Sequence, residues 1–225
     1  MREVSEADGY ALVEPGVSYF DLYEHIQARG YKLWLDVPDP GWGSVLGNAL
    51  DHGVGYTPYG DHFAMQCGME VVLPNGELVR TGMGAIPGAP TWNLHRYGFG
   101  PAWDQLFVQS NFGIVTRAGL WLMPQPECVL GLDVEMDHVE DLGPLIDTLA
   151  PLRREGVLQQ SPSIANWFRA VNILTTRQQW TDRPGALSDE VIAAIRKHYS
   201  LGWWGVSLRV YGRESVARAN FAILD

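Results

Sequence analysis

The first part of the chain alternates short apolar runs with one amphipathic stretch. Residues 10–14 are typical of a strand, because they are mostly apolar and a proline and a glycine then turn the chain. Ser18 and Asp21 have the spacing of a capping box and predict that a helix begins there. Gly30 is expected to end this helix, since glycine readily adopts the left-handed conformation of a helix C-cap. Apolar residues 33–35 predict another strand, so the pattern indicates a β-α-β start.

Turn-forming residues punctuate the next part of the chain. Beyond a glycine-rich segment, two apolar runs at residues 69–73 and 78–80 flank the sequence PNG at 74–76, which is a strong hairpin signal. Residues 114–123 predict another strand. Two prolines one residue apart follow within residues 124–126, and such a pair favours an extended linker. This linker is expected to separate two domains.

We therefore predict one domain over residues 1–124 and a second over residues 125–225. In the second, apolar positions recur at helical spacing in some segments and alternate in others. The order of elements favours an antiparallel sheet with helices on one face, and hence an α+β fold class. The expected elements are a strand at 130–136, a helix at 139–152 that starts nearer Pro144, an ambiguous apolar segment at 164–174 in which strand is slightly favoured, a helix at 188–198, a strand at 204–211 and a helix from Arg213.

The composition agrees with a globular protein and excludes several functional classes. Hydrophobic residues make up 46% of the 225 residues, and 25 glycines and 14 prolines favour many tight turns. The net charge is −10 and there is no basic patch, so nucleic acid is not expected as a partner. No segment is apolar over the length of a bilayer span, so no membrane is expected either. The 2 cysteines exclude a disulfide framework, and a charged N-terminus without a signal-peptide pattern favours a cytoplasmic protein.

The glycine-rich segment is the first candidate for chemistry. Gly41, Gly43 and Gly47 would let the backbone approach a ligand closely. Ser44 could cap a short helix whose first amides face an anion or a polar ring edge. The spacing is not that of the dinucleotide fingerprint, because the third glycine comes one residue late, so a nicotinamide-binding Rossmann site is disfavoured. The residues alone leave open whether this loop binds a ligand or is only structural.

Other candidates are weaker when the residues are taken by themselves. Two Asp-His pairs, at 51–52 and 61–62, suggest a metal site, but the rest of the chain offers no matching cluster of ligands, so none is expected. Asp39 lies in the sequence Pro-Asp-Pro-Gly and is by itself more typical of a turn acid. Tyr56 is by itself more typical of a half-buried core tyrosine.

A longer set of motifs carries a family resemblance. The motifs are PDPGWGSVLGN at 38–48, GVGYTPYGDH at 53–62, GMEVVL at 68–73, RTGMG at 80–84, YGFGP at 97–101 and QSNFGIVT at 109–116. Together they resemble the flavin-domain signature of the vanillyl-alcohol oxidase, eugenol oxidase and 4-cresol dehydrogenase family, whose members oxidise para-substituted phenols. The resemblance covers essentially the whole chain, and it fades in the second domain while the length and the order of elements are kept.

The resemblance implies FAD as the cofactor and an internal segment of a longer enzyme. Residues 1–124 would be part of a PCMH-type FAD-binding domain, and residues 125–225 part of an α+β cap domain. The implied reaction is hydride transfer from a para-substituted phenol to the flavin through a quinone methide, favoured by donors that hold the phenolate. Asp39 would lie beside the reactive flavin nitrogen and act as a base. Tyr56 would be one of the tyrosines that hold the phenolate.

The resemblance also implies a set of cofactor-binding residues and no metal. Family members are longer at both ends: their phosphate-binding loop precedes the position of Met1, and their flavin attachment site lies beyond Asp225. The isolated chain is therefore expected to be inactive. A small phenolic substrate is the expected partner, and the full-length protein is expected to form a homo-oligomer. The implied cofactor-binding residues are Pro38, Asp39, Gly43, Ser44, Gly47, Asn48, Gly55, Tyr56, Gly113, Ile114 and Val115.

Two alternative functions stay open. The first is a non-catalytic domain that serves as a binding or assembly surface, because 9 tryptophans in a truncated fold could leave apolar patches exposed. The second is an FAD-linked oxidase of hydroxy acids or sugars. The run YTPYGDH at residues 56–62 argues against this second alternative.

Overall fold

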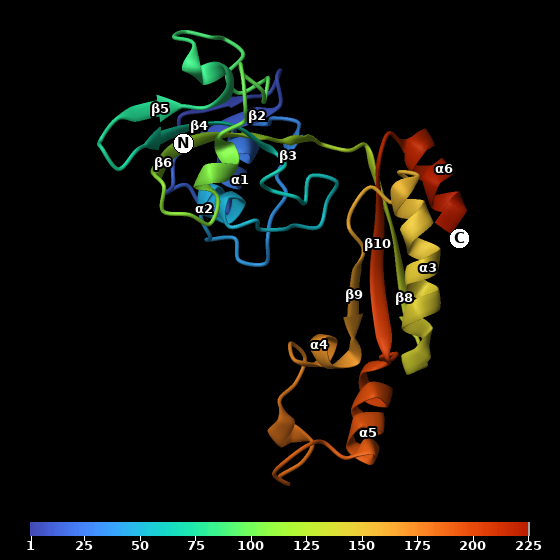
Figure 1. The fold of residues 1–225 in the computed structure, drawn as a ribbon. Coiled ribbons are helices and arrows are strands. Elements are labelled where there is room, and N and C mark those ends of the chain that lie inside the picture. The colour runs from blue at the N-terminus through green and yellow to red at the C-terminus, as the bar shows by residue number, and fades with distance from the viewer. Residues whose placement is uncertain (225) are drawn as a thin grey trace. The chain divides into compact units, whose positions relative to one another are not determined.

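A computed structural model of the chain describes residues 1–224 and divides the chain into two compact units, Met1–Gln125 and Pro126–Asp225 (Figure 1). Each unit combines its own antiparallel sheet with helices. This arrangement confirms the α+β class that the sequence predicts. Within the described residues no helix has the length and apolar character needed to cross a membrane.

The first unit is built on a five-stranded sheet in which neighbouring strands run antiparallel, in the order β1-β2-β6-β4-β5. The PNG sequence at 74–76 forms the turn of the β4-β5 hairpin, as predicted. A separate pair, β3 with β7, lies outside this sheet. The strands are β1 (Glu3–Ser5), β2 (Tyr10–Val13), β3 (Leu33–Trp34), β4 (Gln66–Val72), β5 (Leu78–Arg80), β6 (Ile114–Trp121) and β7 (Met123–Pro124).

Helix α1 (Tyr19–Arg29) begins and ends as its sequence predicts. The Ser18 side chain accepts a hydrogen bond from the backbone of Asp21, and the Asp21 carboxylate accepts one from the backbone N–H of Ser18. Gly30 adopts the left-handed conformation, with φ 66°, and ends the helix. The buried face of α1 places Leu22 and Ile26 in the core of the first unit.

The core of the first unit lies between α1 and the sheet, where Val13, Met69 and Val71 are fully buried. One strand also carries a buried charge. Glu70 in β4 accepts hydrogen bonds from Arg80 at 2.9 Å and Arg117 at 2.7 Å, so its carboxylate is paired rather than isolated. Three short helices complete the unit: α2 (Val45–Leu50), η1 (Gly82–Ala85) and η2 (Asp104–Phe107).

The second unit has a three-stranded antiparallel sheet in the order β8-β10-β9. Helices α3 and α6 lie along one face of this sheet (Figure 1), and α6 contacts both β8 and β10. A smaller cluster of Trp167, Val171 and Ile195 joins α4 to α5. The elements are β8 (Cys128–Met136), η3 (Val139–Asp141), α3 (Leu142–Arg154), β9 (Ser163–Asn166), α4 (Trp167–Val171), η4 (Arg177–Gln179), α5 (Asp189–Tyr199), β10 (Trp204–Gly212) and α6 (Glu214–Leu224).

Two sequence predictions for the second unit need correction. The segment 164–174 is not a continuous strand, because the strand ends at Asn166 and α4 follows. The Asn166 side chain accepts a hydrogen bond from the backbone of Arg169 at 3.1 Å, so it is a helix N-cap. Helix α3 begins at Leu142, before Pro144. Proline is tolerated there, because the first N–H groups of a helix have no partner within the helix.

Candidate active site

Two loops on either side of α2 bring Asp39 and Tyr56 together. The Tyr56 hydroxyl donates a hydrogen bond to Oδ1 of Asp39 at 2.8 Å, although the residues are 17 positions apart in the sequence. Both side chains are exposed, and Tyr56 retains 41% of its accessible surface. The pair therefore presents a carboxylate and a phenol on one surface of the first unit.

The loop that carries Asp39 is tied to the start of α1. The backbone N–H groups of Phe20 and Tyr19 donate to the carbonyls of Gly41 at 2.9 Å and Gly43 at 3.2 Å. These amides begin a helix and would otherwise lack partners. A Cβ atom at Gly41 would lie 2.6 Å from Cζ of Phe20, so a larger residue there would require the exposed Phe20 ring to move.

The same loop ends in the helix cap that the sequence suggests. Oγ of Ser44 accepts a hydrogen bond from the backbone of Gly47 at 2.9 Å and donates one to the carbonyl of Pro15 at 2.6 Å. The first bond caps α2, and the second fixes the loop to the turn that precedes α1. The position of Asp39 thus depends on contacts with two other segments.

A buried carboxylate supports the loop that carries Tyr56. Asp36 is 7% exposed, and its Oδ2 accepts hydrogen bonds from the backbone N–H of Thr57, at 2.7 Å, and from the Thr57 hydroxyl. Its Oδ1 lies 2.6 Å from Nε2 of His62, which is also buried. Because a carboxylate only accepts, Nε2 of His62 carries the hydrogen in this bond. Asp36 therefore holds two points of the segment that follows Tyr56.

The buried network extends to the two neighbouring helices. The Tyr19 hydroxyl in α1 lies 3.0 Å from Oδ1 of Asn48 in α2 and 3.2 Å from Nδ1 of His62. Asn48 Oδ1 also contacts Nδ1 of His62. Burial, followed by the negative charge of Asp36, raises the pKa of Tyr19, so its hydroxyl keeps its proton and remains a donor.

Two glycines let the backbone of this loop lie directly on the network. A Cβ atom at Gly55 would lie 1.3 Å from Oδ1 of Asp36, and one at Gly53 would lie 2.0 Å from Oδ1 of Asn48. The loop is closed by a hydrogen bond of 2.9 Å from the backbone of Gly55 to the carbonyl of Gly60. No other residue type fits at either position without movement of the Asp36 or the Asn48 side chain.

The structure gathers most, but not all, of the predicted site residues. Gly113, Ile114 and Val115 lie at a different place, at the start of β6, where Ile114 and Val115 pair with β4. The Val115 side chain is buried in the core, so only its backbone could meet a ligand, whereas Ile114 is 71% exposed. The residues that share the two loops and α2 are Pro38, Asp39, Gly43, Ser44, Gly47, Asn48, Gly55 and Tyr56.

The sequence did not identify the buried partners of this site. Asp36 lies outside the motifs, and Thr57 and His62 lie within the motif at 53–62 but carry no predicted role, because His62 is adjacent in the sequence to Asp61 rather than to Asp36. The Asp61 side chain instead accepts a hydrogen bond from the backbone of Ala64 at 2.9 Å. Among residues 1–224 no group of three or more potential metal ligands converges.

The two loops that carry Asp39 and Tyr56 also expose apolar side chains. Trp42 is 78% exposed and Val54 is 66% exposed, and they belong to the same two loops. A ring that is apolar on its faces and polar at its edge could stack on such side chains and meet the carboxylate at its edge. The exposed apolar side chains and the carboxylate of these loops are therefore chemically compatible with the isoalloxazine ring of FAD.

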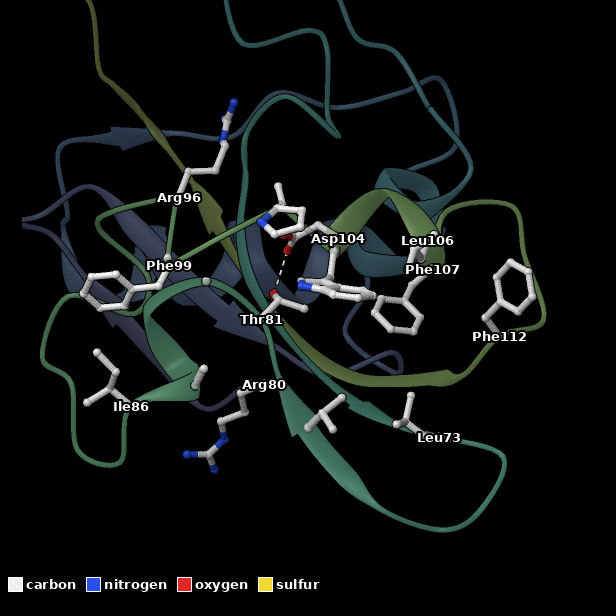
Figure 2. Close-up of a pocket in the computed structure, with 17 residues that line it drawn as sticks. Leu73, Arg80, Thr81, Ile86, Arg96, Phe99, Asp104, Leu106, Phe107 and Phe112 are labelled. Carbon is white, nitrogen blue, oxygen red and sulfur yellow. Dashed lines mark hydrogen bonds between the residues drawn. The ribbon is translucent and has the colours of Figure 1, made fainter.

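A cavity lies elsewhere in the first unit, between β5 and the segment 98–112. Its volume of about 540 Å³ falls in the range of small-molecule sites. Figure 2 shows Phe99 and Phe112 on opposite sides of a hydrogen bond of 2.6 Å from the Thr81 hydroxyl to Asp104. The aromatic residues of the segment 98–112 are the sequence signal from which this cavity could have been expected.

Sequence comparisons identify related proteins. The sequence model of the FAD binding domain family matches residues 1–82. The flavoprotein subunit of 4-cresol dehydrogenase (hydroxylating) from Pseudomonas putida is 41% identical over 217 residues, which cover 96% of this chain and 42% of that protein. The chain therefore spans less than half of the length of this relative.

Solved structures agree with the sequence comparisons. A structure of p-cresol methylhydroxylase with substrate bound matches 99% of this chain and 44% of that chain, with a TM-score of 0.96 and 40% identity. A 4-ethylphenol oxidase from Gulosibacter chungangensis, in complex with isoeugenol, matches 99% of this chain and 43% of that chain, with a TM-score of 0.95 and 41% identity. The cofactor of this domain is FAD. By its sequence and its fold, the chain belongs to the family of flavoproteins with a PCMH-type FAD-binding domain that includes 4-cresol dehydrogenase.

Proposed function

We propose that the full-length protein oxidises para-substituted phenols with FAD. Two relatives that are at least 40% identical act, by their names, on 4-cresol and 4-ethylphenol. The match to each of them extends over nearly the whole of this chain. We further propose that residues 1–124 contribute to the FAD-binding domain and residues 125–225 to the cap over the substrate. The observation that carries the proposal is the hydrogen bond between Tyr56 and Asp39 on an exposed, partly apolar surface.

When bound, FAD supplies the acceptor for the hydride that leaves the substrate. Pro38, Asp39 and the backbone of residues 43–48 would hold its ring. The protein's own contribution begins with Asp39, whose Oδ1 accepts the hydrogen bond from Tyr56. A carboxylate has lone pairs for further donors, so Asp39 can also accept a proton from water that attacks the oxidised substrate.

Tyr56 has two candidate roles. The first is to hold the phenolate oxygen of the substrate, as the family resemblance implies. The second is to orient Asp39, and the geometry favours it because the single hydroxyl hydrogen of Tyr56 is already donated to Asp39. The phenolate oxygen and the para carbon lie on opposite sides of the ring, so a donor bonded to a base near the para carbon is poorly placed to hold that oxygen.

The test measures flavin bleaching by a 4-alkylphenol in the full-length protein without oxygen. We expect Asp39→Asn to slow bleaching roughly 100-fold or more, which is the usual contribution of a general base. Asp61→Asn is the matched control, because Asp61 is an exposed carboxylate in the same region that bonds only locally, to the backbone of Ala64. Equal bleaching rates in the two variants would contradict the role of Asp39. Bleaching by hydroxy acids but not by phenols would contradict the substrate class.

The isolated chain is proposed to be inactive. It spans 42% to 44% of the two cresol-oxidising relatives, so more than half of each relative has no counterpart in it. We expect purified chain mixed with FAD and then desalted to show no flavin absorbance. A retained flavin band that bleaches with a 4-alkylphenol would overturn this part of the proposal.

A second candidate function, assembly with another copy of the protein, rests on the cavity of Figure 2. Phe99 is 90% exposed, Phe112 61% and Trp103 56%, and such grouped apolar side chains often mark an interaction surface. Light scattering of the full-length protein tests it. If a homo-oligomer uses this surface, Phe99→Ser should lower the measured mass, and Ile173→Ser, an 87% exposed position in the second unit, should not.

A further inference from the structure

One carboxylate connects the two loops that carry Asp39 and Tyr56. Asp36 lies three residues before Asp39 on the same segment, and its Oδ2 accepts both hydrogen bonds from Thr57. Thr57 directly follows Tyr56, whose hydroxyl donates a hydrogen bond of 2.8 Å to Oδ1 of Asp39. These residues therefore form a closed ring of backbone and hydrogen bonds, and a shift of Asp36 moves both members of the pair.

His62 fixes the orientation of this carboxylate. Nε2 of His62 lies 2.6 Å from Oδ1 of Asp36, so both oxygens of Asp36 are engaged and its plane cannot turn freely. Both side chains are buried, at 6% and 7% exposure, where such bonds are strong because water does not compete. Tyr19 and Asn48 contact the other ring nitrogen, so the imidazole is held from both sides.

We propose that Asp36 and His62 are positioning residues that set the distance and direction of the contact between Tyr56 and Asp39. Neither group reaches the exposed surface where a substrate would bind, so both act through the loops. The inference rests on the proposed function, in which Asp39 acts on the substrate. It adds that the competent geometry of this pair is imposed by a buried network that links α1, α2 and the two loops.

The perturbation is Asp36→Asn in the full-length protein with its flavin bound. The amide nitrogen of asparagine must face either the Thr57 donors or His62, which must then change tautomer so that its Nε2 accepts, so the ring either loses a bond or replaces a bond to a charged group with a weaker neutral one. Displacement of a reacting group by about 1 Å can cost on the order of 100-fold in rate, so we expect flavin reduction per bound flavin to slow roughly 10-fold to 100-fold. The Michaelis constant for the phenol should change much less.

Asp104→Asn is the matched control. Asp104 is 6% exposed and accepts hydrogen bonds from Gln66 at 3.0 Å and Thr81 at 2.6 Å, but it contacts neither loop through these bonds. A similar loss of rate in both variants would overturn the inference, because it would report general destabilisation. If Asp36→Asn does not fold, Thr57→Val removes one hydroxyl donor from the same ring. Thr57→Val should then slow flavin reduction by a smaller factor than is expected for Asp36→Asn. An unchanged rate of flavin reduction would overturn the inference.

A double-mutant cycle separates positioning from a structural role. In the Asp39→Asn background, Asp36→Asn should slow flavin reduction by less than about a further twofold. The reason is that Asp36 acts on the reaction only through Asp39, which is already replaced. If the two substitutions slow flavin reduction independently, so that their rate factors multiply in the double variant, the inference is overturned. If Asp39→Asn alone leaves the rate unchanged, the proposed function fails instead. The network is then tested separately by the fluorine NMR signal of 3-fluorotyrosine at Tyr56, which should shift in Asp36→Asn and not in Asp104→Asn.

Discussion

Replacement of Gly55 by alanine tests whether the loop rests directly on the buried carboxylate. The added methyl group would lie 1.3 Å from Oδ1 of Asp36 and 2.8 Å from Nε2 of His62. Real carbon atoms do not approach an oxygen so closely, and the two partners are bonded to each other at 2.6 Å. The methyl group must therefore break this bond or lift the loop away from the network.

Two contributions set the expected magnitude. Forcing an additional carbon into a packed interior typically costs about 1–3 kcal/mol. The loss of a hydrogen bond to a buried charged group costs about 1.5–3 kcal/mol. We therefore expect Gly55→Ala to lower the free energy of unfolding of the first unit by about 2.5–6 kcal/mol, which is a large part of the stability of a typical domain.

The assay is denaturant unfolding followed by circular dichroism, with Gly16→Ala as the control. A Cβ atom at Gly16 meets no atom within 4 Å, so this variant should change stability by less than about 1 kcal/mol in either direction. If the unfolding midpoint of Gly55→Ala equals that of Gly16→Ala, the loop does not lie on the network, and the argument for positioning loses its basis.

Three further predictions concern the stability and the reactivity of the chain. Burial by itself would raise the pKa of Glu70, but the hydrogen bonds that it accepts from two arginines and a threonine lower that pKa, so its contribution to stability is present above about pH 4.5 and is lost as the pH falls through the lowered pKa. Glu70→Gln should therefore lower the free energy of unfolding by about 1–3 kcal/mol at pH 7. In melting experiments the difference in stability between this variant and the parent should shrink at pH 3, and a difference that stays constant with pH would contradict this. Burial raises the pKa of Cys67 to about 11, so a thiol reagent at pH 8 should label Cys128 and spare Cys67 until the chain unfolds, as mass spectrometry can show. Gly76→Ala meets open space but needs φ 86°, so denaturant unfolding should show a loss of about 1 kcal/mol from backbone strain, and an unchanged midpoint would rule that strain out.

Features set by neighbouring residues could be predicted from the sequence. The capping box of Ser18 and Asp21 and the C-cap at Gly30 depend on bonds between residues a few positions apart. The β4-β5 hairpin likewise follows from its turn, where Gly76 takes a positive φ that glycine adopts without strain. Local chemistry decides such elements before any distant part of the chain is in place.

Features that depend on distant partners could not be predicted in the same way. The segment 164–174 has an apolar pattern that suits a strand as well as a helix, and the slight preference for strand is wrong beyond Asn166, where α4 begins. Asn166 was the available signal in the sequence, because asparagine is a common helix N-cap and here caps the start of α4. The order β1-β2-β6-β4-β5 gives no such signal, because alternating apolar residues show that a strand has a buried face but not which strand lies beside it.

The motif around Tyr56 shows how far a pattern can lead and where it stops. In the extended segment Gly53 to Thr57, alternate residues point to opposite sides. Gly53, Gly55 and Thr57 face the buried network, while Val54, at 66% exposure, and Tyr56, at 41%, face outward. The alternation of small and large residues is visible in the sequence and predicts a segment whose inner face has no room for side chains. The sequence does not reveal what occupies that room. The occupant is the Asp36 carboxylate, bonded to a histidine 26 positions away, and this long-range contact gives the outward-facing tyrosine its fixed position.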